Sequence, residues 1–319
     1  MGRRLAYLAV VLLVLCSCGA RRTVSPEYRS FPQVQVPGMY TTREEVVDYV
    51  AAHFWDAYFA QSGVTDSAAV LGVRKVEVEQ ALANYIELQD NLPLATARKN
   101  MKGLFAKVEA CQQADTGSLF YLRFTEMVEK YLYDPNSPLR NEDLFLPFVE
   151  ELAECPFTDT LMRTGYRYMA AMCALNPAGS PAPDFRFKDI SGRIHSLYGT
   201  KGEYTMLFFS NPGCDACKVM IEDIDSCPSV SKAIADGRVA LVNIYIDQEI
   251  DKWREYEPTY PRSWITGYDW LYVIRDEQIY DVRAIPSLYL LDSEKKIIMK
   301  DAPTERVLHY LDGKLLENQ

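Results

Sequence analysis

The sequence is short of positive charge and of long apolar runs. Its 319 residues include 34 Lys and Arg against 44 Asp and Glu, a formal net charge of −10. Such an acidic surface repels a phosphate backbone, so we expect no nucleic acid partner. The composition is otherwise ordinary, with 48% hydrophobic and 24% charged residues, which excludes a disordered, collagenous or multi-span membrane protein. The length predicts about two domains.

The N-terminus carries a targeting segment. Arg3 and Arg4 precede an apolar run over residues 5–15, which is too short to span a hydrocarbon core that needs about 20 helical residues. A short basic stretch followed by a short apolar run is typical of an export signal. The run ends in Leu15-Cys16-Ser17-Cys18-Gly19, which resembles a bacterial lipobox.

The lipobox resemblance implies that residues 1–17 are removed as a signal peptide and that Cys18 carries the lipid, a palmitate-type acyl anchor. Gly19 at the next position implies sorting to the outer rather than the inner membrane, with the chain facing the periplasm of the cell envelope. An ordinary signal peptide with incidental cysteines is the alternative. Because the periplasm is oxidising, export changes the meaning of every later cysteine.

A tether and then a helical domain follow. Residues 18–39 are rich in Ser and Pro and have no periodicity, which predicts a tether between lipid and fold. Thr42 and Glu45 then match a capping box at the start of a helix. Further helices are predicted over residues 73–89, 94–110, 119–131, 144–154 and 161–175. Residues 40–175 show no nucleotide loop, metal-ligand spacing or Ser/His/Asp grouping, so they are predicted to be an all-helical domain of unknown function.

A joint at residues 176–183 separates this domain from a C-terminal one. Six of its eight residues are Pro, Gly or Ala, and its three prolines disfavour both helix and strand pairing. Because such a joint offers little packing, we expect the two domains to fold separately. Beyond it, β-rich runs at 204–210, 239–247 and 287–292 alternate with helix-compatible stretches. This alternation predicts an α/β domain over residues 184–319, with a central mixed β-sheet flanked by helices.

The chemistry is concentrated in Cys214-Asp215-Ala216-Cys217. This C-x-x-C pair follows the apolar strand 206–209 and precedes a predicted helix over 218–224, so Cys214 lies near a helix N-terminus. Unpaired backbone N–H groups and the helix dipole stabilise an anion there, which lowers the pKa of a thiol and makes it nucleophilic. Cys217, one turn further on, is in reach to resolve a mixed disulfide.

Two other uses of the pair remain open. A zinc site would need a second pair of ligands, whereas His195, His309 and Cys227 are each isolated in the sequence. A structural disulfide would suit an oxidising compartment. We expect no metal and no other cofactor. Four further cysteines could form structural bridges in any of three pairings: Cys111, Cys155, Cys173 and Cys227.

A second element favours the redox use. Ile285-Pro286-Ser287 places a proline directly before an apolar strand, and together with the upstream strand–C-x-x-C–helix this resembles the thioredoxin superfamily, in which a cis proline faces the C-x-x-C. The resemblance implies that Pro286 belongs to the catalytic site and that the Ile285 backbone pairs with an extended substrate. Gly213, next to Cys214, is assigned to the same substrate-binding group. A plain edge-strand proline is the alternative for Pro286 alone.

The beginning of the C-terminal domain narrows the resemblance. Residues 179–185 and 189–192 are similar to the start of the peroxiredoxin-related, membrane-anchored reductases of cytochrome maturation. The whole chain resembles lipoproteins of Gram-negative anaerobes that join a helical domain of unknown function to a thioredoxin-like domain, and residues 133–141 carry that match in the helical part.

Thioredoxin and the cytochrome-maturation reductases each have a buried acidic residue near the cysteine pair, and this chain lacks it. Phe208 stands where thioredoxin has it, and Met220 stands where the cytochrome-maturation relatives have it. A proton relay to the buried cysteine is therefore not implied by the resemblance.

These observations predict a lipid-anchored thiol–disulfide oxidoreductase that faces the periplasm. Cys214 attacks, Cys217 resolves, and Pro286 with Ile285 positions the substrate chain. The expected partners are protein disulfides or dithiols and an unidentified membrane redox partner.

Two rival interpretations exist. A peroxidase that uses Cys214 alone is disfavoured, because the Pro-x-x-x-Thr-x-x-Cys arrangement is missing: position 207 is Leu and position 211 is Asn. The other rival is a binding lipoprotein whose helical domain holds a partner, with a redox-inert thioredoxin fold as scaffold.

Overall fold

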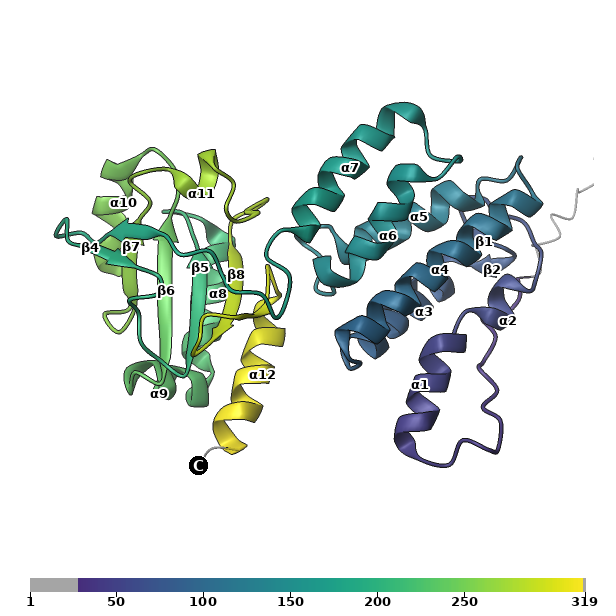
Figure 1. The fold of residues 1–319 in the computed structure, drawn as a ribbon, viewed down its shortest axis with the longest axis horizontal. Coiled ribbons are helices and arrows are strands. Elements are labelled where there is room, and N and C mark those ends of the chain that lie inside the picture. The colour runs from purple at the N-terminus through teal and green to yellow at the C-terminus, as the bar shows by residue number, and fades with distance from the viewer. Residues whose placement is uncertain (1–27, 318–319) are drawn as a thin grey trace, which may run out of the picture.

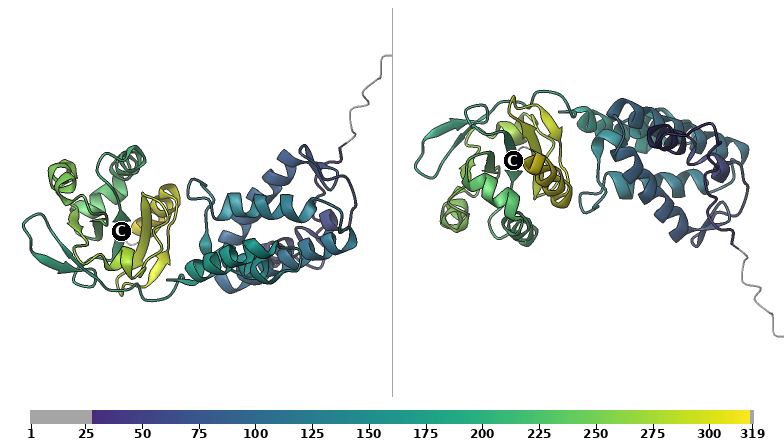
Figure 2. Two further views of the ribbon diagram at one scale, coloured as in Figure 1. Left: turned by 90° about the horizontal axis from the view of Figure 1, so that it is seen from above. Right: turned by 90° about the horizontal axis from the view of Figure 1, so that it is seen from below.

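The computed structural model describes residues 28–317, which form two lobes joined through residues 176–183 (Figure 1). The views from above and from below show the two lobes side by side (Figure 2). The predicted signal peptide and the lipidation residue Cys18 lie outside the described residues. Within residues 28–317, no helix is both long and apolar enough to cross a membrane. We call residues 28–175 the N-terminal lobe and residues 184–317 the C-terminal lobe.

The elements of the N-terminal lobe are α1 (Arg43–His53), α2 (Asp56–Phe59), β1 (Ala69–Val70), β2 (Val73–Arg74), α3 (Lys75–Asp90), α4 (Leu94–Ala114), α5 (Phe120–Leu132), α6 (Glu142–Glu154) and α7 (Thr160–Ala174). The elements of the C-terminal lobe are β3 (Arg186–Lys188), β4 (Ile194–Ser196), β5 (Tyr204–Phe209), α8 (Asp215–Ser226), α9 (Pro228–Ala235), β6 (Val239–Tyr245), α10 (Ile250–Tyr256), the short 3-10 helix η2 (Glu257–Thr259), β7 (Ile265–Tyr268), α11 (Val273–Asp276), β8 (Ser287–Asp292), β9 (Ile297–Met299) and α12 (Thr304–Glu317).

The N-terminal lobe packs its helices around one aromatic core. Trp55, Tyr58, Phe124 and Phe148 are almost completely buried in it. The predicted capping box of α1 is present, because the Thr42 side chain accepts the Glu45 N–H and the Glu45 carboxylate accepts the Thr42 N–H. The helices predicted from periodicity are all found, with ends shifted by a few residues.

The prediction that this lobe is all-helical is wrong in one place. Val73, expected to begin a helix, lies in β2, which pairs antiparallel with β1. The two residues between these strands, Leu71 and Gly72, have φ angles of 51° and 75°. Positive φ at both central residues is the geometry of a tight two-residue hairpin turn. A leucine in that conformation is uncommon, so the turn was not visible in the sequence pattern, and α3 begins at Lys75 instead.

Part of the predicted tether belongs to the fold. The Arg29 N–H donates to the Gly72 carbonyl at 2.9 Å, beside the hairpin. The ring of Phe31 stacks on Tyr58 with centroids 5.2 Å apart and meets Trp55 edge-on at 5.4 Å. The tether prediction is therefore wrong for residues 29–31, because Phe31 covers an aromatic surface that only the folded helices create.

The C-terminal lobe is a seven-stranded mixed sheet in the order β4-β3-β7-β6-β5-β8-β9. The neighbours of β6 run parallel to it, whereas β8 runs antiparallel to β5 and to β9. Helices α8, α9 and α12 cover one face over an apolar cluster, and a second cluster fills the other face beneath α11 and the β3–β4 region. This confirms the predicted mixed sheet flanked by helices.

The pairing of β5 with β8 determines where the candidate site forms. Phe209, at the end of β5, lies opposite Ser287, at the start of β8. The C-x-x-C follows Phe209 by a few residues and Pro286 directly precedes Ser287. The two predicted halves of the site therefore meet at the same end of the paired strands β5 and β8.

The joint between the lobes is attached to the sheet. The Gly179 N–H donates to the Ile297 carbonyl at 2.7 Å, and the Ile297 N–H donates back to Ser180 at 2.9 Å. The Ala182 N–H donates to Lys295 at 2.8 Å, and Pro181 lies between these paired residues at the strand edge, where its missing N–H is tolerated. The expectation that the joint makes little packing is therefore wrong.

Candidate active site

Cys214 and Cys217 form a disulfide at the start of α8, with Cα atoms 5.2 Å apart. Cys214 is the N-cap residue itself, and its Sγ accepts the Cys217 N–H at 3.1 Å. The helix begins at Asp215, earlier than predicted, so Cys214 lies at the end of the helix where backbone N–H groups are free. Cys214 is partly exposed, whereas only 2% of Cys217 is exposed. Cys214 can therefore meet a substrate while Cys217 is shielded.

The turn before the pair needs a glycine. Gly213 has a φ angle of 73°, in the left-handed region that side chains disfavour. It is exposed and directly precedes Cys214. The structure thus gives Gly213 a conformational role at the site edge, beside the predicted role in substrate binding.

The charges nearest the pair offset each other. Asp215 and Lys218 form an exposed ion pair at 3.1 Å, and the Asp215 hydrogen bond raises the pKa of Lys218. One carboxylate and one ammonium in contact present little net charge to the Cys214 sulfur. The helix N–H groups are therefore the local feature that favours a thiolate at Cys214.

Ile285 and Pro286 lie at the end of the paired strands that also carries the cysteine pair. The Ile285–Pro286 peptide bond is cis, and Ile285 packs against the same apolar cluster as Cys214. Both residues are partly exposed at the sheet edge. The structure therefore brings together, at one end of the paired strands β5 and β8, the residues Gly213, Cys214, Cys217, Ile285 and Pro286.

Sequence reasoning missed a buried polar group behind the pair. The Ser210 hydroxyl donates to Asn243 Oδ1 at 2.6 Å and lies 3.0 Å from the Tyr260 hydroxyl. Burial raises the pKa of Tyr260, which packs in the same cluster as Cys217. These polar side chains lie near the end of β5, where Phe208 stands in place of the acid that thioredoxin has. Asn243 is a polar interruption in the apolar run Val239–Tyr245, and that signal could have found it.

The remaining cysteines of the described chain are free thiols. Cys155 and Cys173 are buried in the N-terminal lobe, and Cys111 and Cys227 are partly exposed. Burial raises the pKa of Cys173, which makes its thiol a poor nucleophile. The structure therefore shows none of the possible bridges between these four. Among residues 28–317, no group of three or more His, Cys, Asp or Glu side chains is placed to hold a metal ion.

The segment before Pro286 carries two partly buried charges. Asp281 contacts Arg283 at 3.5 Å, and about nine-tenths of the Asp281 side chain is buried. Burial, with the nearby charge of Glu142, raises the pKa of Asp281 to about 6. The ionised carboxylate is thus disfavoured in the fold.

We expect an Asp281→Asn variant to gain stability relative to the wild type as pH rises. A folded pKa of about 6 lies above the unfolded value of about 3.9, so the stabilisation from the protonated form is complete below about pH 4 and is lost as pH rises through 6. Asparagine removes this loss. The unfolding free energy of the variant minus that of the wild type should therefore rise by on the order of 2 kcal/mol between pH 4 and pH 7. Denaturant unfolding at both pH values measures it. The exposed Asp251→Asn is the control, and an equal difference at both pH values would contradict the assignment.

Comparisons with known proteins give matches for both lobes. Residues 17–176 match the family model described as "Domain of unknown function (DUF5106)". A crystal structure of a thioredoxin-like protein from Bacteroides caccae ATCC 43185 is 31% identical, with 89% of this chain and 98% of that chain covered and a TM-score of 0.73. The share covered means that this match extends over both lobes.

Two further matches are partial. The C-terminal domain of an uncharacterized protein from Bacteroides fragilis NCTC 9343 is 40% identical, with 44% of this chain and 99% of that chain covered and a TM-score of 0.42. Thioredoxin-like protein YneN of Bacillus subtilis is 30% identical over 122 residues, which are 38% of this chain and 68% of the relative.

Proposed function

The chain belongs to the family of the domain of unknown function DUF5106 and to the thioredoxin-like proteins, and we propose that it is a thiol–disulfide oxidoreductase that uses Cys214 and Cys217. One observation carries the proposal. The disulfide lies at the N-terminus of α8, with Cys214 partly exposed and Cys217 buried, at the same end of the paired strands β5 and β8 as Pro286. A purely structural disulfide has no need of this asymmetry.

The reaction follows from that asymmetry. In the reduced chain, the Cys214 thiolate attacks one sulfur of a substrate disulfide, and the other substrate sulfur leaves as a thiolate that takes up a proton. The Cys217 thiolate then attacks the Cys214 sulfur, which forms the disulfide seen here and releases the second substrate thiolate. Two electrons pass from the cysteine pair to the substrate, and a dithiol donor returns them. With a dithiol substrate the same steps run in reverse.

Turnover of a protein disulfide tests the proposal. The purified chain should accelerate the reduction of insulin by dithiothreitol, and replacing Cys214 should return the rate to that of dithiothreitol alone. An unchanged rate in the presence of the wild-type chain would contradict the proposed activity and favour a binding protein built on a redox-inert fold.

We also propose that the chain is lipid-anchored in the cell envelope and faces the periplasm, with the outer membrane favoured. The lipobox-like Leu15-Cys16-Ser17-Cys18 supports this. In that location the substrates would be protein disulfides or dithiols, and the dithiol donor would be a membrane redox partner.

A Cys18→Ala variant is expected to lose acyl labelling and to leave the membrane fraction, because the thiol of Cys18 is the acceptor of the lipid in this proposal. Labelling cells with a palmitate analogue, followed by membrane fractionation, measures both effects. Cys16→Ala is the matched control and should keep the label. Unchanged labelling of the Cys18 variant would rule out the anchor.

A further inference from the structure

The segment that leads to Pro286 is held by the other lobe. The Arg283 guanidinium forms an ion pair with Glu142, the first residue of α6, at 2.7 Å. Its Cζ lies 3.9 Å from the centroid of the Tyr133 ring, and it donates a hydrogen bond to the Tyr133 carbonyl. Only 14% of the Arg283 side chain is exposed. Arg283 therefore joins the N-terminal lobe to a point three residues before Pro286.

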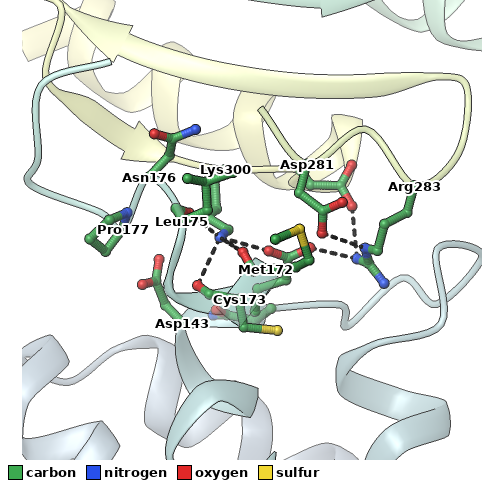
Figure 3. A network of polar contacts seen from close by, with 12 residues as sticks. Asp143, Met172, Cys173, Leu175, Asn176, Pro177, Asp281, Arg283 and Lys300 are labelled. Atoms are coloured by element: carbon green, nitrogen blue, oxygen red, sulfur yellow. Dashed lines mark hydrogen bonds and ion pairs between the residues drawn. The ribbon is translucent and has the colours of Figure 1, made fainter. Parts of the chain in front are cut away.

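Glu142 is itself fixed in place. Its second oxygen forms an ion pair with Lys300 at 2.7 Å, and both side chains are about 98% buried. Lys300 also donates to the Cys173 carbonyl at 2.9 Å and to the Leu175 carbonyl at 2.6 Å, at the end of α7. Figure 3 shows Lys300 directed at this end of α7, with Arg283 and Asp281 beside it. The Glu142 carboxylate cannot shift without leaving a buried cation unpaired.

The path from this anchor to the candidate site is short. Ala284 alone separates Arg283 from Ile285, and Ile285 packs against the apolar cluster that Cys214 also contacts. Asp301 adds a second anchor to Arg283 at 3.1 Å from within the C-terminal lobe. The position of residues 283–286 is therefore determined jointly by both lobes.

We propose that Glu142 is a positioning residue for substrate docking: through Arg283 it fixes the segment 283–286 on which an extended protein substrate lies beside Cys214. The helical lobe is then part of the oxidoreductase site rather than a separate module. This inference rests on the proposed function. It predicts that Glu142 matters for a polypeptide disulfide, which must align along the segment, more than for a small disulfide, which needs only Cys214.

Two variants and one control test the proposal in the full chain. Glu142→Gln removes the charge that holds Arg283. Arg283→Lys keeps the positive charge but gives up the stack on Tyr133 and the forked geometry, so it remains informative if the first variant folds poorly. Arg306→Gln is the control, because it breaks a different contact between the lobes, the ion pair with Asp90 at 3.3 Å, in which no residue of the segment 283–286 takes part.

The readouts are kcat/KM for insulin and for hydroxyethyl disulfide. In both test variants we expect the ratio of the two to fall roughly tenfold, mainly through a higher KM for insulin, which is within the range by which such coupled positions act. The ratio should stay within twofold of wild type in Arg306→Gln. An unchanged ratio in the test variants, or an equal fall in all three, would overturn the proposal.

Hydrogen exchange separates this inference from the proposed function. The amides of residues 283–288 should exchange faster in Glu142→Gln and Arg283→Lys than in the wild type and in Arg306→Gln. If the wild type reduces neither disulfide, the proposed function is wrong. Faster exchange would then still support the placing of the segment by Glu142, and unchanged exchange would overturn it.

Discussion

A Cys217→Ser chain is expected to accumulate covalent complexes with its substrates, whereas a Cys214→Ser chain should accumulate none. The partly exposed Cys214 makes the first bond, and the buried Cys217 is needed only to break it. Removing Cys217 therefore stops the reaction at the mixed disulfide, and removing Cys214 prevents the first step. Turnover of insulin should fall at least roughly a thousandfold in both variants, as is usual when a member of a catalytic pair is lost.

Non-reducing gels of envelope extracts measure the trapped complexes, which a reducing agent should dissolve. Cys227→Ser is the matched control, because Cys227 is also a partly exposed thiol on the same lobe but is not paired with another cysteine. It should trap nothing and keep wild-type turnover. If neither active-site variant traps a partner and reduced Cys214 resists alkylation at pH 7, the pair is a structural disulfide and the binding-protein interpretation replaces the enzyme.

The parts of this protein that the sequence predicted are those fixed by local signals. The capping box at Thr42 depends on residues within one turn. The apolar run before Cys214 and the proline before Ser287 are each readable in a few residues. Pairing of β5 with β8 then brings the last two together without any further information.

The parts that were missed depend on residues far apart in the chain. Phe31 looks like part of a tether until the helices that carry Trp55 and Tyr58 have folded. Glu142 and Lys300 look like ordinary surface charges, since nothing near either of them in the sequence indicates burial. The proline-rich joint suggested that the lobes fold independently, because its composition shows only which backbone conformations it prefers. It does not show that Gly179 forms a backbone hydrogen bond with Ile297 of β9.

The charges between the lobes form one connected group. The C-terminal lobe contacts not only Glu142 but also Arg140 of the N-terminal lobe. The Arg140 guanidinium donates to the carbonyls of Asp301 and Ala302 at 2.8 and 3.1 Å. Burial raises the pKa of Asp301, and Arg140 and Arg283 both oppose that shift. Each buried charge here is tolerated because a partner from the other lobe or from the same loop is present. Separating the lobes would break these ion pairs and hydrogen bonds at the same time, so we expect the two lobes to unfold together.

A Lys300→Met variant should lose about 3–5 kcal/mol of unfolding free energy, the usual loss when one partner of a buried ion pair is removed. Methionine fills a similar volume but leaves the Glu142 carboxylate with one of its two cations, Arg283, and the end of α7 without its donor. Denaturant unfolding measures the loss. Limited proteolysis should also cut the joint at residues 176–183 in the variant but not in the wild type, where backbone hydrogen bonds to the sheet protect it.

Two further variants make this prediction specific. Lys296→Met is the matched control, because Lys296 lies near Lys300 in the sequence but is about half exposed and pairs only with the exposed Glu294, so its loss should change stability by less than about 1 kcal/mol. The double variant Glu142→Gln with Lys300→Met should be more stable than Lys300→Met alone, since it no longer buries a carboxylate that has lost one of its two cations. If Lys300→Met behaves like Lys296→Met and its joint stays protected, the buried ion pairs do not hold the lobes together. The contacts of the joint with the sheet would then have to do so on their own.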